Sequence, residues 1–241
     1  LLPLNFRLAP TELLYVLTDS DAELLFVSAD YLPIVLSLRA HIPRLQRVIV
    51  IDESEGSEYS QLFVDAPRLS PVSLHHAELD DVAVQMYTSG TTGQPKLARH
   101  THGGLLVGAF SNGAAMRGEP VGTLMGGLPL FHIGGALITG LSWLLAGGTI
   151  ILPTPTGLRN PSVIRDYWRM VERLRPDLVG GVPTSLGALL DVPDSAADRS
   201  MVRFCLTGAS ALPIEVARRF TQRFGIPISE GYGMTEVHGY S

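Results

Sequence analysis

Short apolar runs alternate with segments of helical periodicity along nearly the whole chain. The apolar runs are rich in β-branched and aromatic residues and have the length of buried strands. They predict strands at residues 24–27, 48–51, 82–87, 149–152, 202–206 and 227–229. Apolar residues at helical spacing predict helices at residues 11–17, 31–39, 102–116, 161–174 and 213–224. Pro161 and Pro213 stand where proline favours a helix start, and Gly225 stands where glycine ends one.

This alternation is typical of βαβ units, so we expect an α/β fold with parallel-rich sheets and helices on both faces. Ligands in such folds bind at the carboxyl ends of the strands. Residues 52–80 contain few apolar residues and are predicted to be a linker. We therefore place a boundary near Leu79, with residues 1–79 in a first α/β subdomain and residues 80–241 in a second.

Composition favours a compact interior over a disordered chain, because 46% of the 241 residues are hydrophobic and 17% are charged. The net charge of -5 provides no basic field for nucleic acid or an anionic membrane. The longest apolar stretch, residues 133–145, contains three glycines and is predicted to be a buried helix and not a membrane span.

The single cysteine, Cys205, lies in the apolar run at 202–206 and cannot form an intrachain disulfide. A reducing, cytoplasmic location is expected, and an apolar strand favours a packing role over a nucleophilic one. The chain begins at Leu1 without a basic leader, so we expect no secretory signal. Its abrupt ends suggest a fragment of a longer enzyme.

A loop of small polar residues follows the strand predicted at 82–87. It consists of Thr88, Ser89, Gly90, Thr91, Thr92, Gly93, Gln94, Pro95 and Lys96. Small residues let several backbone N–H groups converge on one anion, and the hydroxyls add further donors. Lys96 adds a positive charge at the end of the loop. This composition predicts a binding site for a nucleotide triphosphate, with an ordinary polar turn as the alternative.

The loop differs from the Walker motif, in which a lysine followed by a hydroxyl residue opens a helix. Here Pro95 precedes Lys96 and favours extended geometry, so the loop is expected to continue into a strand. A P-loop phosphotransferase is therefore the weaker alternative, beside a non-catalytic nucleotide-binding module.

Two further loops follow predicted strands. Residues 231–236 follow the strand at 227–229 and include an aromatic side chain, a hydroxyl and the carboxylate of Glu236, which suits Mg²⁺. Residues 207–210 follow the strand at 202–206, and their small side chains would let a flat base lie against the backbone. His132 stands between Phe131 and two glycines, where a histidine is more often structural than catalytic.

Four segments resemble, in order, the motifs of the AMP-forming acyl-adenylate superfamily, which includes acyl-CoA synthetases, firefly luciferase and the adenylation domains of peptide synthetases. They are residues 87–96, 128–135, 207–213 and 231–236. The opening residues 3–8 also resemble this family, so the likeness runs the length of the chain. The sequence Phe131-His132-Ile133-Gly134-Gly135 favours an acyl-CoA synthetase over a carrier-protein-dependent adenylation domain.

The resemblance implies ATP and coenzyme A as substrates, Mg²⁺ as the metal, and a small fatty or aromatic carboxylic acid. It assigns nucleotide binding to Thr88, Ser89, Gly90, Thr91, Thr92, Gly93, Lys96, Gly208, Ala209, Ser210, Gly231, Tyr232, Gly233, Met234 and Thr235. It assigns catalysis to Lys96, Thr235, Glu236 and His132, with Glu236 as the metal ligand. It assigns substrate contacts to His132, Val182 and Met234.

The resemblance also implies groups that this chain does not contain. The family completes its site with an aspartate for the ribose, a following arginine and a lysine from a C-terminal domain, all downstream of residue 241. We therefore expect the isolated chain to have negligible ligase activity. Leu97 replaces the glycine that usually follows the loop lysine, and Arg99 stands where an apolar residue is common.

Overall fold

The computed structural model describes residues 1–52, 54–65, 76–88, 95–115, 122–193 and 196–240. By their contacts the residues form two compact units. The small unit comprises Leu2–Glu78 and Tyr87–Leu97, and the large unit comprises Leu1, Leu79–Met86 and Ala98–Ser241. The assignment of residues 1–79 and 80–241 to two functional subdomains stays a prediction.

The small unit is built around two parallel strands, β1 (Leu24–Ser28) and β2 (Arg47–Ile51), paired from Leu24 opposite Arg47 to Ser28 opposite Ile51. Leu25 and Val27 of β1 point into a core shared with helices α1 (Pro10–Asp19) and α2 (Leu32–Leu38). Short 3₁₀ turns at Ala29–Tyr31 and Arg39–His41 flank α2.

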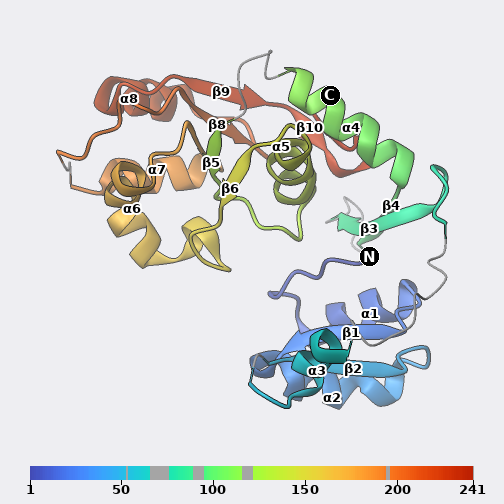
Figure 1. Ribbon diagram of the computed structural model, residues 1–241. Coiled ribbons are helices and arrows are strands. Elements are labelled where there is room, and N and C mark those ends of the chain that lie inside the picture. Colours follow the sequence, from blue (N-terminus) through green and yellow to red (C-terminus); the bar gives the residue numbers. More distant parts are fainter. Residues whose placement is uncertain (53, 66–75, 89–94, 116–121, 194–195, 241) are drawn as a thin grey trace. The chain divides into compact units, whose positions relative to one another are not determined.

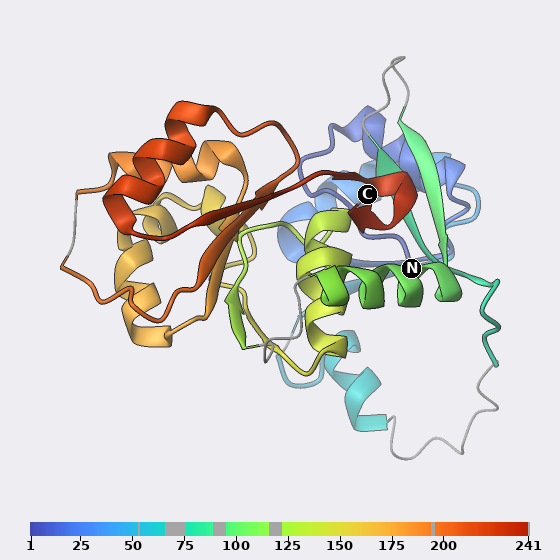
Figure 2. The same ribbon diagram turned by 90° about the horizontal axis from the view of Figure 1, so that it is seen from above.

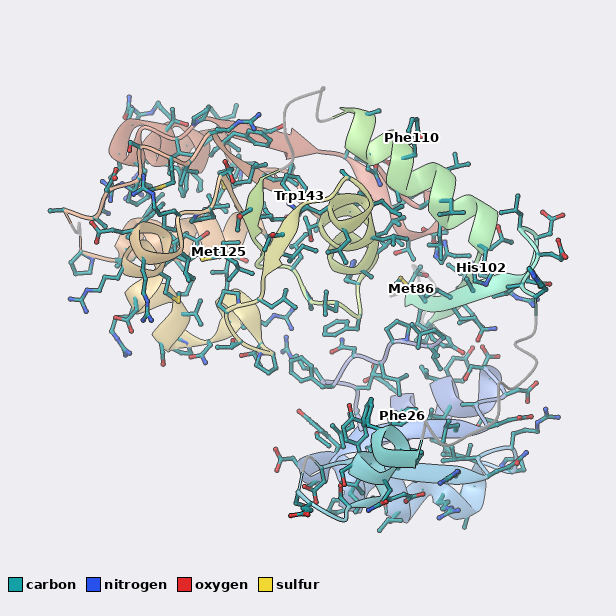
Figure 3. The ribbon with its side chains drawn as sticks, in the orientation of Figure 1. Phe26, Met86, His102, Phe110, Met125 and Trp143 are labelled. Atoms are coloured by element: carbon teal, nitrogen blue, oxygen red, sulfur yellow. The ribbon has the colours of Figure 1, made fainter. Side chains whose placement is uncertain are left out.

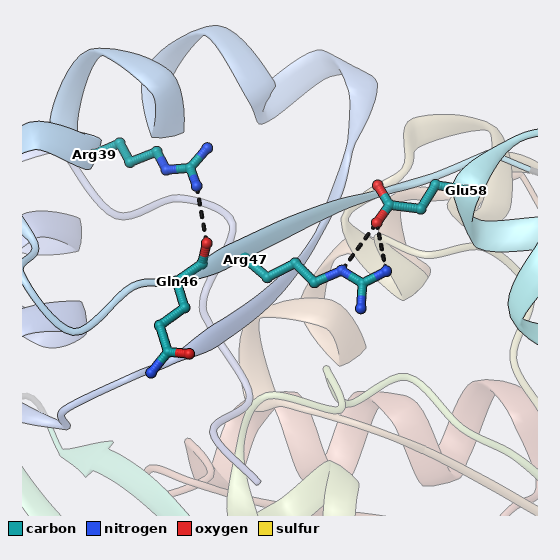
Figure 4. A network of polar contacts seen from close by, with 4 residues as sticks. All are labelled: Arg39, Gln46, Arg47 and Glu58. Carbon is teal, nitrogen blue, oxygen red and sulfur yellow. Dashed lines mark hydrogen bonds and ion pairs between the residues drawn. The ribbon is translucent and has the colours of Figure 1, made fainter.

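Helix α3 (Glu58–Asp65) follows β2 within the region predicted to be a linker, so that prediction was wrong for these residues. Glu58 accepts two hydrogen bonds from the guanidinium of Arg47 at 2.7 and 2.9 Å, and Arg39 donates to the carbonyl of Gln46 (Figure 4). The ring of Tyr59 also contacts Phe26 of β1 edge to face. Contacts with both strands therefore hold this helix, whose sequence EYSQLFVD contains apolar and aromatic residues within a region that is otherwise poor in them.

The large unit contains a five-stranded parallel sheet in the order β6-β5-β7-β8-β9 (Figures 1 and 2). Its strands are β5 (Thr123–Met125), β6 (Thr149–Ile151), β7 (Leu178–Gly181), β8 (Phe204–Gly208) and β9 (Ile228–Gly231). Met125, Val179 and Cys205 pack on one face against α6 (Pro161–Leu174), α7 (Pro183–Asp191) and α8 (Ile214–Phe224). Leu124 and Leu178 pack on the other face against Trp143 of α5 (Ser142–Leu145), which Figure 3 labels. This arrangement confirms the predicted α/β fold with helices on both faces.

Further elements precede the five-stranded sheet in the sequence or follow it. A separate two-stranded sheet joins β3 (Val82–Thr88) to β4 (Lys96–Thr101), which runs directly into α4 (His102–Ala115). Beyond β9 lie β10 (Gly233–Met234), the 3₁₀ turn η6 (Thr235–Val237) and β11 (Gly239–Tyr240). The strand predicted after the polar loop is thus confirmed. Among the described residues, none of the helices combines the length and apolar character needed to cross a membrane.

Sequence patterns missed β5, β7 and α7. The first two are only three and four residues long, and β7 ends in two glycines, which weaken a strand pattern. The helix predicted from Pro213 begins at Ile214, with Pro213 as its N-cap.

The stretch at 133–145, predicted to be one helix, is a π-helix η4 (Gly134–Leu141) followed by α5. Two hydroxyls reach back five residues: Thr139 donates to the carbonyl of Gly134 at 3.1 Å, and Ser142 donates to that of Leu137 at 2.8 Å. Both side-chain bonds span five residues, which is the spacing of the backbone hydrogen bonds in a π-helix. Gly135 packs against the carbonyl oxygens of Leu128 and Pro129, which leaves no space for a side chain.

Replacing Gly135 by alanine should therefore destabilise the fold. A Cβ atom there would overlap main-chain atoms, and overpacking of this kind typically costs about 1–3 kcal/mol. A Cβ atom added to Gly187, in α7, would have no neighbouring atom within 4 Å, so Gly187→Ala should be neutral or stabilising by up to about 1 kcal/mol. Urea unfolding of the two variants would measure this difference, and equal free energies of unfolding would contradict it.

Cys205 should be unreactive in the folded protein. Its side chain is buried in β8, and burial raises the pKa of its thiol to about 12, so almost no thiolate forms at pH 8. A chromogenic disulfide reagent should detect the thiol only after unfolding in concentrated guanidinium chloride. Rapid reaction of the native protein would show that the strand around Cys205 opens.

Candidate nucleotide-binding site

Several predicted site residues gather at the carboxyl edge of the five-stranded sheet. Strands β7, β8 and β9 are parallel neighbours, with Gly181 opposite Thr207 and Gly208 opposite Gly231. Val182 directly follows β7 and is the N-cap of α7. The segments at 208–210 and 231–236 leave the sheet from the ends of β8 and β9. The structure therefore brings together three segments that lie far apart in the sequence.

The end of β8 comes very close to the end of β9. A Cβ atom on Gly208 would lie 2.7 Å from the carbonyl oxygen of Gly231, so only glycine fits there. Ala209 follows with a left-handed φ of 71°, a conformation uncommon for a residue with a side chain. The backbone N–H of Leu212 donates to the Glu230 carboxylate at 2.9 Å and ties the loop after β8 to β9.

Strand β8 (Phe204–Gly208) begins and ends later in the chain than the strand predicted at 202–206, so Thr207 and Gly208 are its last residues and not part of the following loop. Ala209 and Ser210 are exposed beyond it. The Thr207 hydroxyl is buried and has no hydrogen-bond partner among the described residues.

The second motif forms a tight turn beyond β9. Strands β10 and β11 pair antiparallel, with Gly233 opposite Tyr240 and Met234 opposite Gly239, and η6 carries Thr235 and Glu236 between them. Tyr232 is 70% exposed, and Met234 and Glu236 are also exposed. The aromatic ring and the carboxylate expected to contact the nucleotide are therefore accessible, and Thr235 is half-buried.

The donor chemistry of this turn fits magnesium. In the described part of the chain, neither a hydrogen bond nor an ion pair holds the carboxylate of Glu236. The same residues include no group of three or more His, Cys, Asp or Glu side chains that could hold a metal by themselves. Magnesium commonly binds through one or two carboxylates together with substrate phosphates and water, so a single exposed carboxylate is consistent with such a site.

Two histidines pack behind the turn, and sequence patterns did not predict their contact. The rings of His100, in β4, and His238, just after η6, lie 4.8 Å apart between centroids at 72°. Burial lowers the pKa of His100, His238 lowers it further, and Glu236 opposes this by raising it. His100 is therefore neutral at pH 7 and packs as an uncharged ring.

Ser89, Gly90, Thr91, Thr92 and Gly93 of the predicted phosphate loop lie outside the described residues. Thr88 ends β3 and Lys96 begins β4, and the Thr88 hydroxyl donates to the carbonyl of Lys96 at 3.4 Å. Lys96 is exposed. Because Lys96 opens a strand and not a helix, the geometry argues against a Walker-type P-loop.

Both ends of this loop are attached to α1 within the small unit. The Tyr87 hydroxyl donates to the Asp19 carboxylate at 2.6 Å, and the Tyr15 hydroxyl donates to the carbonyl of Pro95 at 3.3 Å. The two tyrosine rings meet edge to face. Burial, together with the bond to Asp19, raises the pKa of Tyr87, which keeps the phenol protonated as a donor. No sequence motif indicated this anchor, since Tyr15 and Asp19 belong to an unremarkable helix.

His132 lies on the segment between β5 and η4. Its backbone N–H donates to the carbonyl of Pro129 at 3.1 Å, and its own carbonyl accepts from Ala136 at 2.8 Å. The side chain retains a solvent-exposed side, while the surrounding protein lowers the pKa of the imidazole and the guanidinium of Arg159 lowers it further. His132 is therefore neutral at pH 7 and can donate or accept a hydrogen bond. No local sequence pattern connects Arg159 with it.

Comparison with known protein families and sequences places these observations in context. The family model described as AMP-binding enzyme matches residues 1–241. Feruloyl-CoA synthase from Amycolatopsis sp is 36% identical over 236 residues, which cover 98% of this chain and 44% of that protein. Sulfoacetate–CoA ligase from Cupriavidus necator is 32% identical over 240 residues, with 98% and 44% coverage. The chain thus spans less than half the length of these relatives.

Solved structures show the same fold. The anthranilate CoA ligase AuaEII in complex with anthranoyl-AMP gives a TM-score of 0.82 at 26% identity, covering 99% of this chain and 46% of that one. The inhibitor-bound N-terminal domain of FACL13 from Mycobacterium tuberculosis gives a TM-score of 0.84 at 28% identity, covering 99% and 57%. The family match along residues 1–241 and the agreement in fold show that this chain belongs to the family of AMP-binding enzymes.

Proposed function

We propose that the chain is part of an ATP-dependent acid–CoA ligase. Such an enzyme activates a carboxylic acid as an acyl-adenylate and then transfers the acyl group to the thiol of coenzyme A. The observation that carries the proposal is the register of β8 and β9, which sets Gly208 opposite Gly231 and brings two nucleotide-binding motifs to neighbouring points. The CoA ligases among the relatives support the choice of reaction.

The roles proposed for the large unit follow from which groups are exposed at that edge. The ring of Tyr232 is available to stack on adenine, beside the small residues Gly208, Ala209 and Ser210. The Thr235 hydroxyl would donate to the α-phosphate. Gly231, Gly233 and Met234 shape the turn around that hydroxyl.

The roles proposed for the loop in the small unit follow from its composition. Thr88, Ser89, Gly90, Thr91, Thr92 and Gly93 would supply hydroxyl and backbone donors to the β- and γ-phosphates. Lys96 would add a positive charge. The attachment of Tyr87 and Pro95 to α1 would hold the ends of this loop at a fixed separation.

Charge neutralisation is the main task of the residues in the first step. A carboxylate oxygen attacks the α-phosphorus, the bond to the bridging oxygen breaks, and pyrophosphate leaves. An anion thereby approaches a polyanion, so donors and positive charge placed beforehand lower the barrier. Magnesium held by Glu236 would supply positive charge when bound. In the second step the thiol sulfur attacks the acyl carbon and loses its proton to solvent, the bond between that carbon and the phosphate oxygen breaks, and AMP leaves.

His132, Val182 and Met234 are proposed to contact the acid. A neutral imidazole can donate a hydrogen bond to the substrate carboxylate without having to act as a base. Val182 follows β7 at the same edge as the nucleotide motifs, and Met234 is partly exposed there. The relatives' names include aromatic acids and the charged sulfoacetate, so we propose a small carboxylic acid, fatty or aromatic, without naming one.

We further propose a cytoplasmic enzyme whose isolated 241-residue segment lacks ligase activity, because the segment spans less than half of its relatives. A carrier protein in place of coenzyme A remains the second candidate for the acceptor.

The full-length protein should catalyse acid-dependent exchange of pyrophosphate into ATP and should release AMP. A panel of short, long and aromatic acids would identify the substrate, and the 241-residue chain alone should give no exchange above background. Formation of ADP would contradict the proposal, and so would exchange that no acid stimulates. Formation of a CoA thioester would distinguish coenzyme A from a carrier protein as the acceptor.

Lys96→Ala should weaken ATP binding about 10- to 100-fold, because a charge-assisted hydrogen bond is worth roughly 1.5–3 kcal/mol. Arg99→Ala is the matched control, since Arg99 is an exposed cation on the same strand and has no proposed role at the loop. Titration calorimetry with MgATP would compare the two variants. Equal affinities for Lys96→Ala and the unaltered protein would refute the assignment of the loop.

A further inference from the structure

We propose that His238 is a positioning residue for Thr235 and Glu236. Its side chain packs between His100 and a face of α4 that carries two glycines, and this packing fixes the turn that contains Thr235 and Glu236. This inference rests on the proposed function of those two residues in binding MgATP. It is carried by the backbone of the turn, by its fit to α4, and by the burial of His100 and of the His238 Nε2 atom.

The turn has an unusual backbone. His238 has a left-handed φ of 62°, and the following Gly239 has a φ of 110°. A left-handed conformation is uncommon for any residue other than glycine, and it persists where surrounding contacts determine it. His238 is only two residues from Glu236, so whatever holds His238 also sets where the carboxylate lies.

Helix α4 forms one side of the space that His238 occupies. Gly104 and Gly108 are four residues apart and therefore lie on the same face of the helix. A Cβ atom on Gly108 would lie 2.8 Å from the Cβ of His238 and 3.2 Å from its carbonyl oxygen, and one on Gly104 would overlap Nε2 of the ring. The histidine therefore occupies the space that two missing side chains leave on α4.

Residues of β4, η4 and α4 form the other sides of this space. The ring of His100 meets that of His238 edge to face, with centroids 4.8 Å apart. Ile138 of η4 and Asn112 of α4 lie against Gly239, where a Cβ atom would be 2.7 Å from Ile138 Cγ1 and 3.4 Å from Asn112 Nδ2. The turn that carries Thr235 and Glu236 is thus held from several directions behind its exposed side.

Stability alone does not account for two histidines in this place. Both ring nitrogens of His100 and Nε2 of His238 are buried and have no hydrogen-bond partner among the residues that the structure describes. Buried polar groups without partners destabilise a fold, and apolar side chains of similar size would avoid that penalty. The His238 ring nevertheless fits against Gly104 and His100, and its Cβ atom fits against Gly108, which favours a role in geometry.

The test compares two alanine variants on the same helix. Gly108→Ala would displace His238 from its position against α4. Gly113→Ala is the matched control, because a Cβ atom there would meet only the carbonyl oxygen of Ser142, at 4.0 Å. In the ¹⁵N-labelled 241-residue chain, Gly108→Ala should shift the amide resonances of Thr235 and Glu236, and Gly113→Ala should leave them in place. Unchanged resonances in folded Gly108→Ala would overturn the inference.

Kinetics of the full-length protein supply the second readout. Gly108→Ala and His238→Asn should each raise the KM for MgATP in acid-dependent pyrophosphate exchange about tenfold, in line with the effect of residues that orient a metal ligand. Asparagine tolerates a left-handed φ, so His238→Asn removes the ring without forcing the backbone to change and serves if Gly108→Ala does not fold. A purely structural role would lower kcat through loss of folded protein and leave KM unchanged, which would count against positioning.

These outcomes separate the inference from the proposed function. If the unaltered full-length protein shows no acid-dependent exchange, the proposed ligase function fails, while the resonances of Thr235 and Glu236 still decide whether His238 positions them. If exchange is normal but neither the resonances nor KM respond to Gly108→Ala and His238→Asn, the positioning role fails and the ligase function stands.

Discussion

The main-chain pairing of β8 with β9 is the constraint on which the candidate site depends. Each of the two motifs at the ends of these strands is, taken alone, an ordinary loop rich in small residues. Parallel pairing with Gly208 opposite Gly231 fixes their separation to that of neighbouring strands, and the lack of a side chain on Gly208 allows the close approach. The bond from Leu212 to Glu230 then holds the loop after β8 against β9. Two peptide segments become one surface because their backbones are hydrogen-bonded.

Aromatic packing on one face of the sheet supports this geometry. Trp168 of α6 lies 4.3 Å from Phe224 of α8 and 6.3 Å from Phe220, measured between ring centroids, and all three are buried. The guanidinium of Arg199 covers Trp168 at 5.2 Å. Truncating a buried aromatic residue typically costs about 3–5 kcal/mol, so these contacts anchor both helices to the sheet. The site residues can therefore lie on loops, because the packed helices and sheet that position these loops remain stable.

The sequence was informative wherever a physical signal is local. Hydrophobic periodicity located α6 within its observed bounds and indicated the parallel sheet, and the proline before Lys96 correctly indicated a strand. The sequence pattern did not predict short strands such as β7, because four residues that end in two glycines show no hydrophobic periodicity. The contacts of His238 with His100, and of Tyr15 with Pro95, join residues far apart in the sequence. No local pattern encodes such contacts, because they exist only after the tertiary fold has formed.

The charges assigned to the site can be compared with charges that form surface ion pairs. Glu215 and Arg218 form an ion pair at 2.7 Å on the surface of α8, and such exposed pairs contribute roughly 0–1 kcal/mol. Within the described residues, Lys96 and Glu236 belong to no ion pair. Leaving them unpaired therefore sacrifices little stability, whereas a charge-assisted bond to a phosphate is worth roughly 1.5–3 kcal/mol. An internal partner would compete with a ligand for the same charge, so the unpaired state of each residue is consistent with the phosphate contact proposed for Lys96 and the magnesium contact proposed for Glu236.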